Sequence, residues 1–265
     1  MADTLIRHTR AKLNLSLAVY APDETGYHPI ASDFCQIQYS DTLIIQPQRA
    51  KYMTLHCRNR QVPVSEANTL VRAYALIAPD LDHGFRVILH KRIPLGSGLG
   101  GGSANAGGFL RAINERYLGY SSDKLRRVAI RVGCDVPFFT LGGSRAWVTG
   151  YGECLDALPG LNRQYAVLIL PCAVSTAAVY AAYDAAGIYT DTRSDNALQA
   201  CVYALYPQYH ALIALWNRVY AANPLRLTGS GGTVFALFRS YRQARQAYTY
   251  ARRHTPYWVA LTHTL

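Results

Sequence analysis

The sequence predicts an α+β protein of two domains, the second of them a split-βαβ layer. Three observations lead to this prediction. Strand and helix patterns alternate along the chain, no internal repeat is present, and a turn-rich connection at residues 158–162 divides the pattern in two. Half of the 265 residues are apolar, which is enough for one large core or two small ones. We expect the domains at 1–158 and 159–265.

The N-terminal half opens on a strand at residues 11–19, in which leucine or valine occupies every second position from Leu13. Its other face carries Lys12, Asn14 and Ser16. A loop of turn formers follows at residues 21–29. Later strands are expected at 34–45, 52–57, 84–93 and 144–150, and helices at 65–78 (capped by Ser65), at 109–118, and from Ser121 or Ser122 to Gly133.

The C-terminal half mixes strands and helices, with a third glycine loop between two of its strands. Strands are expected at 165–170, just before 229, at 233–238 and at 257–262. Helices are expected at 176–186, 196–206, 210–222 and 240–253. This order is typical of a split-βαβ layer with helical insertions.

The formal net charge of +11 comes from 23 arginines and only four lysines. Such a charge attracts nucleic acid or a phosphorylated small molecule. Because the arginines are dispersed and no nucleic-acid motif is present, we expect no nucleic-acid partner. No apolar run reaches the length of a membrane span and no leader opens the chain, so no membrane partner is expected. Six scattered cysteines without a C-x-x-C pair argue against a zinc site or a disulfide scaffold and favour the cytoplasm.

The run at residues 94–108, with seven glycines in fifteen residues, separates a strand pattern from a helix pattern. Glycines there let backbone N–H groups converge at a helix N-terminus, which binds anions and phosphate above all. A P-loop is disfavoured because Gly102 stands where its lysine must be, and a flexible linker because both flanks are strongly patterned. Gly96, Gly98 and Gly101 meet the short dinucleotide fingerprint, although it normally starts directly off a strand. A longer pattern, P-x-x-x-G-L-G-G-G-S, begins at Pro94.

A second glycine-bounded loop, residues 133–143, holds one acid, Asp135. A phosphotransferase needs a group that orients or deprotonates the acceptor hydroxyl, and cations that offset charge on the transferred phosphoryl. Asp135 can supply the first and Lys12 the second. Taken singly, such an aspartate is more often a turn residue, and a lysine on a polar strand face is more often solvated.

Read together, these segments resemble a known superfamily. The longer glycine pattern is similar to the phosphate loop of the galactokinase, homoserine kinase, mevalonate kinase and phosphomevalonate kinase (GHMP) superfamily. Gly26-Tyr27-His28 and Gly133-x-Asp135-Val136-Pro137 resemble one branch, the 4-diphosphocytidyl-2-C-methyl-D-erythritol kinases. Shorter matches lie at residues 39–43, 196–198 and 227–235, so the resemblance covers about residues 11–235.

The resemblance implies a two-domain small-molecule kinase fold, with the active site in the cleft between an N-terminal ATP-binding domain and a C-terminal ferredoxin-like domain. It implies ATP-dependent phosphorylation of a hydroxyl of the cytidine-diphosphate-linked alcohol, in the non-mevalonate isoprenoid pathway. The implied cofactors are ATP and Mg²⁺. A bacterial, cytoplasmic enzyme is expected, as a monomer or a dimer.

The resemblance also implies roles for individual residues. Asp135 would act as base and Lys12 would stabilise the transferred phosphoryl. The implied substrate contacts are Asn14, Tyr27, His28, Thr176, Tyr180, Gly229, Ser230 and Gly231. The implied ATP contacts are Asn68, Lys91, Pro94, Gly96, Gly98, Leu99, Gly100, Gly101, Gly102 and Ser103, and Ser103 is also a candidate for contact with Mg²⁺.

The chain departs from the family pattern at several positions. Ala104 stands where a second serine is common, and Gly107 and Gly108 stand inside the helix, where each lowers helix propensity by roughly 1 kcal/mol. Three other functions stay open at this point: a sibling kinase acting on mevalonate, homoserine or a sugar, a non-catalytic anion or nucleic-acid binder, and a nicotinamide dehydrogenase.

Overall fold

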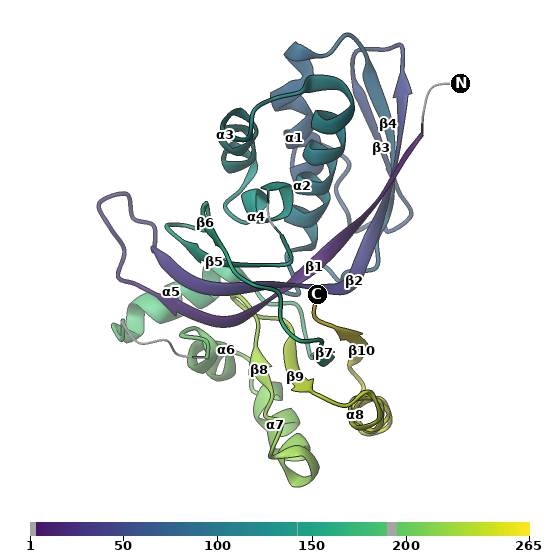
Figure 1. Cartoon of the computed structure of the whole chain (residues 1–265). Coiled ribbons are helices and arrows are strands. Elements are labelled where there is room, and N and C mark those ends of the chain that lie inside the picture. Colours follow the sequence, from purple (N-terminus) through teal and green to yellow (C-terminus); the bar gives the residue numbers. More distant parts are fainter. Residues whose placement is uncertain (1–3, 142, 190–194) are drawn as a thin grey trace.

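The structure is a computed structural model that describes residues 4–141, 143–189 and 195–265. These residues form two β-sheets and eight α-helices. Gly142, in the predicted second glycine loop, lies outside the described residues. Figure 1 shows the first sheet with its helices above and the second sheet with its helices below. Among the described residues, no helix is long and apolar enough to cross a membrane.

The first sheet is organised around one long strand, β2, which pairs with β1 along most of its length. The other edge of β2 pairs with β4 near one end and with β5 near the other, and the strand order β3-β4-β2-β5-β6 results. The strands are β1 (Leu5–Val19), β2 (Ile30–Gln48), β3 (Met53–Cys57), β4 (Gly84–His90), β5 (Arg145–Thr149) and β6 (Cys154–Ala157).

Four helices cover this sheet, and their apolar sides bury a core with its strands. They are α1 (Thr69–Ile77), α2 (Gly101–Ile113), α3 (Ser122–Val132) and α4 (Val136–Leu141). The 3₁₀ turn η1 (Ala78–Asp80) follows α1, and the π turn η2 (Asn114–Leu118) follows α2. α2 packs on α1, on α4 and on β1, so the glycine-rich helix lies at the centre of this layer.

The second sheet has the strand order β10-β7-β9-β8 and is antiparallel throughout. Numbered from its own first strand, this order is 4-1-3-2, and so the predicted split-βαβ layer is confirmed. Its strands are β7 (Tyr165–Leu170), β8 (Arg226–Leu227), β9 (Val234–Phe238) and β10 (Trp258–His263). Its helices are α5 (Thr176–Ala186), α6 (Gln199–Leu205), α7 (Gln208–Tyr220) and α8 (Tyr241–His254).

The first strand of the chain belongs to the cores of both halves. Leu17 and Val19 are buried in the core of the second sheet and its helices, while Ala11 and Leu13 pack against Leu168 and its neighbours. The change from one sheet to the other falls between β6 and β7, near the predicted boundary. The division into domains at 1–158 and 159–265 stays a prediction.

The structure corrects three of the predicted elements. The predicted cap Ser65 is wrong, because Asn68 caps α1 by accepting a hydrogen bond from the backbone N–H of Leu70 at 2.9 Å. The predicted loop at 133–143 contains the helix α4, which begins directly after Asp135. The helix expected from residue 109 begins at Gly101, inside the glycine run.

Candidate active site

The glycine run forms a tight loop that leads from β4 into α2. Gly96, Gly98 and Gly100 all have positive φ angles, of 62°, 72° and 71°, a conformation that favours glycine. Gly100 is the N-cap of α2, and the backbone from Gly101 onward forms the first turn of that helix. The loop therefore presents a helix N-terminus, whose N–H groups attract anions.

The first and third glycine loops touch backbone to backbone. A Cβ on Gly98 would lie 2.5 Å from the carbonyl oxygens of Gly231 and Thr228, and a Cβ on Gly232 would lie 2.4 Å from the Gly96 carbonyl. The N–H of Thr233 donates to the Ser97 carbonyl at 3.0 Å. Several of these glycines are thus required by loop packing, and this contact joins the two sheets at the site.

Lys12, Asn14 and Asp135 come together where β1 passes beneath these loops. Lys12 Nζ lies 3.8 Å from Asp135 Oδ2 and donates to Asn14 Oδ1 at 2.5 Å. Asn14 receives a hydrogen bond from Thr228 Oγ1 at 3.2 Å, and its amide nitrogen donates to Ser32 Oγ at 2.8 Å. The Lys12 ammonium also lies 4.4 Å from the centre of the Phe34 ring. Lys12 and Asn14, on the polar face predicted for this strand, are therefore buried and linked by hydrogen bonds.

Burial controls the electrostatics of Lys12. Its side chain is 4% exposed, and this desolvation lowers the pKa of the ammonium, while the Asp135 carboxylate raises it in part. The Asp135 side chain is 31% exposed and borders open space. A buried cation beside a half-buried carboxylate is an arrangement suited to proton transfer and to stabilising a transferred anion.

A cavity of about 880 Å³ opens beside this pair. It is of a size that holds a small molecule. Eleven of the predicted site residues line it: Lys12, Asn14, Tyr27, His28, Gly98, Gly100, Asp135, Thr176, Tyr180, Gly229 and Ser230. The structure thus brings the predicted catalytic pair and nearly all predicted substrate contacts to one cavity. Gly231 is the exception, and it packs against Val202 and Val174 instead.

Aromatic side chains also line this cavity. The exposed ring of Tyr27 packs edge-on against Tyr151, with centroids 5.8 Å apart, and the His28 ring lies 5.2 Å from that of Tyr180. His28 Nδ1 is 2.8 Å from the Tyr20 carbonyl and Nε2 is 3.1 Å from Asp184. Burial raises the pKa of Tyr180 to about 12, so this phenol stays neutral at pH values where a free tyrosine ionises.

Comparison with known proteins identifies the family. Residues 68–143 match the model described as GHMP kinases N terminal domain, and residues 181–256 match GHMP kinases C terminal. 4-Diphosphocytidyl-2-C-methyl-D-erythritol kinase of Alkaliphilus metalliredigens is 30% identical over 91% of this chain and 90% of its own. The enzyme of the same name from Methylococcus capsulatus is 32% identical over 95% of this chain and 88% of its own. The chain belongs to the 4-diphosphocytidyl-2-C-methyl-D-erythritol kinase family.

Solved structures agree with this membership. A crystal structure of 4-(cytidine 5'-diphospho)-2C-methyl-D-erythritol kinase matches this kinase with a TM-score of 0.80 at 29% identity, over 98% of this chain and all of the other. A homoserine kinase from Cytophaga hutchinsonii shares the fold, with a TM-score of 0.70 at 18% identity, over 100% of this chain and 95% of the other.

The predicted ATP contacts of this kinase divide into two groups. Gly98 and Gly100 line the cavity. The others lie in or around the phosphate loop and do not line the cavity: Asn68, Lys91, Pro94, Gly96, Leu99, Gly101, Gly102 and Ser103. Lys91 forms a buried ion pair with Asp41, and its Nζ would lie 2.7 Å from a Cβ on Gly101. Asn68 caps α1, whose first residue, Thr69, donates to the Gly102 carbonyl at 2.9 Å.

Leu99 contributes its backbone to the site, since its side chain is fully buried and its carbonyl accepts a hydrogen bond from the Lys12 N–H at 3.0 Å. Ser103 lies partly exposed in the first turn of α2.

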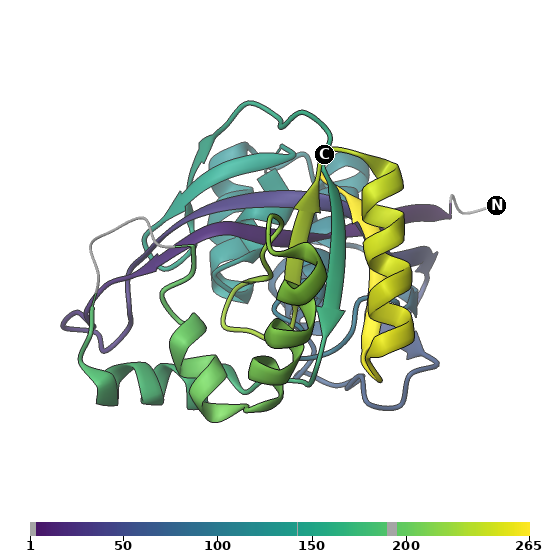
Figure 2. The same cartoon turned by 90° about the horizontal axis from the view of Figure 1, so that it is seen from below.

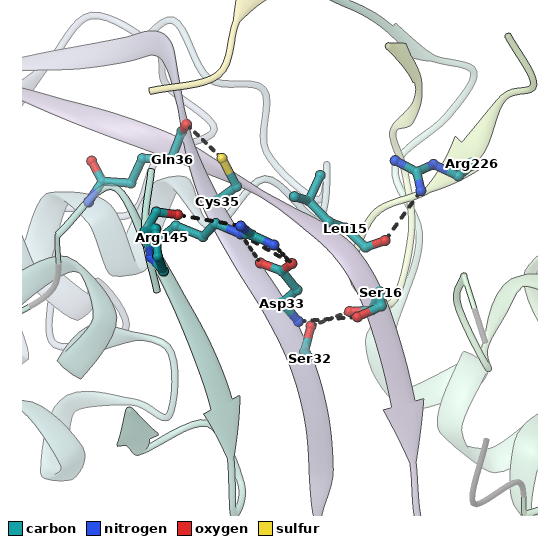
Figure 3. A network of polar contacts seen from close by, with 9 residues as sticks. Leu15, Ser16, Ser32, Asp33, Cys35, Gln36, Arg145 and Arg226 are labelled. Atoms are coloured by element: carbon teal, nitrogen blue, oxygen red, sulfur yellow. Dashed lines mark hydrogen bonds and ion pairs between the residues drawn. The ribbon is translucent and has the colours of Figure 1, made fainter. Parts of the chain in front are cut away.

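Sequence reasoning missed the contacts that fix the strands carrying this site. Ser32 donates to the Ser16 carbonyl at 2.5 Å, and Arg145 forms an ion pair with Asp33 through contacts of 2.9 Å and 2.5 Å (Figure 3). The Ser32 bond joins β2 to β1 at the register shift between Asn14 and Ser16, and the Arg145–Asp33 pair joins β5 to β2. Arginines and serines in strands give no signal that could have identified these contacts.

Sequence reasoning also missed Asp41 and Asn196, although both lie in segments that resemble the family. Asp41 Oδ1 accepts hydrogen bonds from the N–H groups of Arg92 and Ile93, at 2.7 Å and 2.8 Å. It therefore fixes the entry to the phosphate loop. Asn196 Nδ2 donates to the Gly229 carbonyl at 2.8 Å and so holds the third loop.

Proposed function

We propose that this kinase transfers the γ-phosphoryl group of ATP to a hydroxyl of 4-diphosphocytidyl-2-C-methyl-D-erythritol, in the non-mevalonate route to isoprenoids. The observation that carries the proposal is the buried Lys12 ammonium, 3.8 Å from the Asp135 carboxylate, in a cavity that is also lined by aromatic rings. The names of the family members and the phosphate loop beside the same cavity support it.

In the proposed step, Asp135 accepts the proton of the acceptor hydroxyl while that oxygen attacks the γ-phosphorus. The new O–P bond forms as the bond between the γ-phosphorus and the leaving oxygen of ADP breaks. Lys12, held in place by Asn14, stabilises the negative charge of the phosphoryl group during its transfer. Because the ammonium is already buried, little reorganisation is needed when charge develops.

The cytosine of the substrate is proposed to lie among Tyr27, His28 and Tyr180. Stacking on these rings suits one pyrimidine base. Both nitrogens of His28 are already engaged, by Tyr20 and Asp184. His28 is therefore proposed to contact the base through its ring face or backbone, and not through a free ring nitrogen. The hydroxyl of Thr176 lies 2.7 Å from that of Ser230, so this pair links α5 to the third loop across the substrate.

ATP is proposed to bind with its phosphates at the N-terminus of α2. Mg²⁺ typically takes few protein ligands when it bridges phosphates, and within residues 4–141, 143–189 and 195–265 no group of three His, Cys, Asp or Glu could hold a metal ion. Ser103, partly exposed in the first turn of α2, fits such a limited role. When bound, Mg²⁺ would neutralise phosphate charge. Since ATP is the donor and the relatives are bacterial, we place the reaction in a bacterial cytoplasm.

ADP release measured across a panel of acceptor alcohols tests the substrate. We expect rapid, Mg²⁺-dependent turnover with 4-diphosphocytidyl-2-C-methyl-D-erythritol, and only background rates with mevalonate, homoserine, galactose or no acceptor. Tyr27→Ala should raise KM for the cytidine substrate and leave KM for ATP unchanged. Faster turnover of any other alcohol would overturn the proposal.

A further inference from the structure

An open groove of about 660 Å³ runs along α8, away from the substrate cavity. Tyr220, at the end of α7, forms one wall, and residues of α8 form the rest. Figures 1 and 2 both place α8 across the second sheet from α5, the helix that borders the substrate cavity. The proposed reaction leaves this groove without a role.

The outward face of α8 carries only positive charge. The helix contains Arg242, Arg245, Arg252 and Arg253 and no acidic residue. In the part of the chain that the structure describes, none of these arginines pairs with a carboxylate. The opposite face is already occupied, because its alanines are buried against the second sheet. The helix has no free apolar face with which to enter a membrane.

The three groove arginines form an extended row. Arg242, Arg245 and Arg253 span eleven residues of helix, or about 16 Å at 1.5 Å per residue. A compact anion such as a single nucleotide would meet only part of this row. An extended polyanion meets all of it.

Aromatic side chains lie among these cations. Tyr220, Tyr241 and Tyr250 line the groove, and the Tyr241 side chain is half exposed. The ring of Tyr250 is braced by His254, with centroids 4.4 Å apart, and by Tyr220 at 5.6 Å. An acidic peptide needs the cations alone, whereas unpaired bases stack on rings while their phosphates contact arginine.

We propose that this groove binds single-stranded nucleic acid, by stacking on Tyr241 and by phosphate contacts to Arg242, Arg245 and Arg253. The binding depends little on base sequence, since the contacts invoked are to ring faces and phosphates. It goes beyond the proposed kinase activity and does not depend on it. Because the arginines are dispersed along the sequence, the sequence alone did not indicate a nucleic-acid site. The fold places these three along one groove.

Fluorescence anisotropy with a labelled oligouridylate of about 15 nucleotides, a length that covers one binding site, tests the proposal. We expect binding that weakens from about 50 to about 200 mM salt, as phosphate contacts do. The triple variant Arg242→Gln/Arg245→Gln/Arg253→Gln should lower the affinity at least tenfold and reduce the salt slope by about one for each arginine.

A matched triple variant on α3, Arg126→Gln/Arg127→Gln/Arg131→Gln, controls for net charge. These arginines are exposed and equal in number, but none of them lines the α8 groove. Tyr241→Ala should weaken single-strand binding about fivefold or more and leave duplex binding unchanged. Kinase turnover should be unaffected in the α8 variants, which reports that they are folded.

Equal weakening by the α3 and α8 triples would show diffuse attraction to a cationic protein and overturn the proposal. The proposal would also be overturned if the natural chain did not bind the oligouridylate. It would be overturned, too, if anionic vesicles bound as tightly as the oligouridylate and Tyr241→Ala did not change that binding.

Discussion

At the scale of single residues, the site depends on one buried cation and one half-buried carboxylate. Lys12 and Asp135 come from segments more than a hundred residues apart, and only their pairing gives either a chemical role. Lys12 has three neighbours that restrict it: Asp135, Asn14 and the Phe34 ring. Its ammonium is therefore fixed where the proposed transfer takes place.

Asp135→Asn should lower kcat by roughly 10²- to 10⁴-fold, the usual contribution of a general base. Asparagine keeps the shape of the side chain but cannot accept the proton. Thermal unfolding should change little, because Asp135 lies at the edge of the cavity. Asp156→Asn, which removes an exposed carboxylate on β6, is the control and should keep full turnover. Full activity in Asp135→Asn would exclude the assigned role.

The pH dependence of kcat/KM should report Lys12. Burial lowers the pKa of the ammonium, so activity should fall as pH rises through that lowered pKa, before a free lysine would titrate. Stability should move the opposite way. Between the lowered pKa and the ordinary one the unfolded chain holds more protons, and therefore Lys12 makes the free energy of unfolding increase with pH there.

Lys12→Arg separates these effects, since a guanidinium stays charged throughout. Its kcat/KM should be lower overall, and the alkaline decline assigned to Lys12 should be absent. An unchanged alkaline limb in this variant would assign the decline to another group.

At the scale of elements, loops that are distant in sequence fit against one another. The phosphate loop and the third glycine loop are in backbone contact, and this contact is possible because glycines there have no side chain to clash with the carbonyl oxygens of the other loop. The substrate loop at residues 21–29 is held by the turn between β5 and β6, where Tyr151 donates to Asp23 and lies 3.2 Å from Thr25. Each loop is therefore positioned by a neighbour as well as by its own sequence.

Gly98→Ala should destabilise the protein more than Gly119→Ala. Both glycines have positive φ, which costs alanine about 1–2 kcal/mol. A Cβ at Gly119 meets nothing within 4 Å, whereas one at Gly98 lies 2.5 Å from two carbonyl oxygens. Urea unfolding should show the larger loss for Gly98→Ala, together with a loss of kinase activity that Gly119→Ala does not share. Equal losses would mean that the loops do not need this contact.

Tyr151→Phe should raise KM for the cytidine substrate about three- to tenfold, because the substrate loop loses its hydrogen bond to Tyr151 while the ring contact with Tyr27 remains. The kcat value and KM for ATP should not change. Tyr52→Phe, at an exposed tyrosine outside the cavity, is the matched control. A parallel rise in both KM values would indicate a general structural effect.

At the scale of the whole molecule, β1 joins the two halves. Leu17 and Val19 are buried in the core of the second sheet, although they lie near the start of the chain. Each such side chain contributes about 1.5–3 kcal/mol when it is fully buried. The second half by itself therefore lacks part of its own core.

We expect the complete chain to unfold in one transition and the fragment 159–265 to lack a native fold. Urea denaturation followed by both near- and far-ultraviolet circular dichroism tests the first point, and the amide proton dispersion of the fragment tests the second. A well-dispersed spectrum from the fragment alone would show that the C-terminal half is an independent domain.

The sequence by itself determined the order of most elements and the type of chemistry. Periodicity predicted β7 and α5 to the residue, and the 4-1-3-2 sheet followed from element order. Spacing predicted a phosphate loop, and the family resemblance placed Lys12 beside Asp135. These features are local or belong to recurrent motifs, so they can be read along the chain.

Only the tertiary structure showed which glycines are required by close packing. A Cβ on Gly107 would lie 2.6 Å from Phe139 Cβ, and one on Gly108 would lie 2.5 Å from Thr9 Cγ2. These glycines lower helix propensity but let α2 approach α4 and β1 closely. The supports of Asn14 and of the loops, among them Ser32 and Asn196, were likewise invisible, because hydrogen bonds between distant strands leave no periodic trace in a sequence.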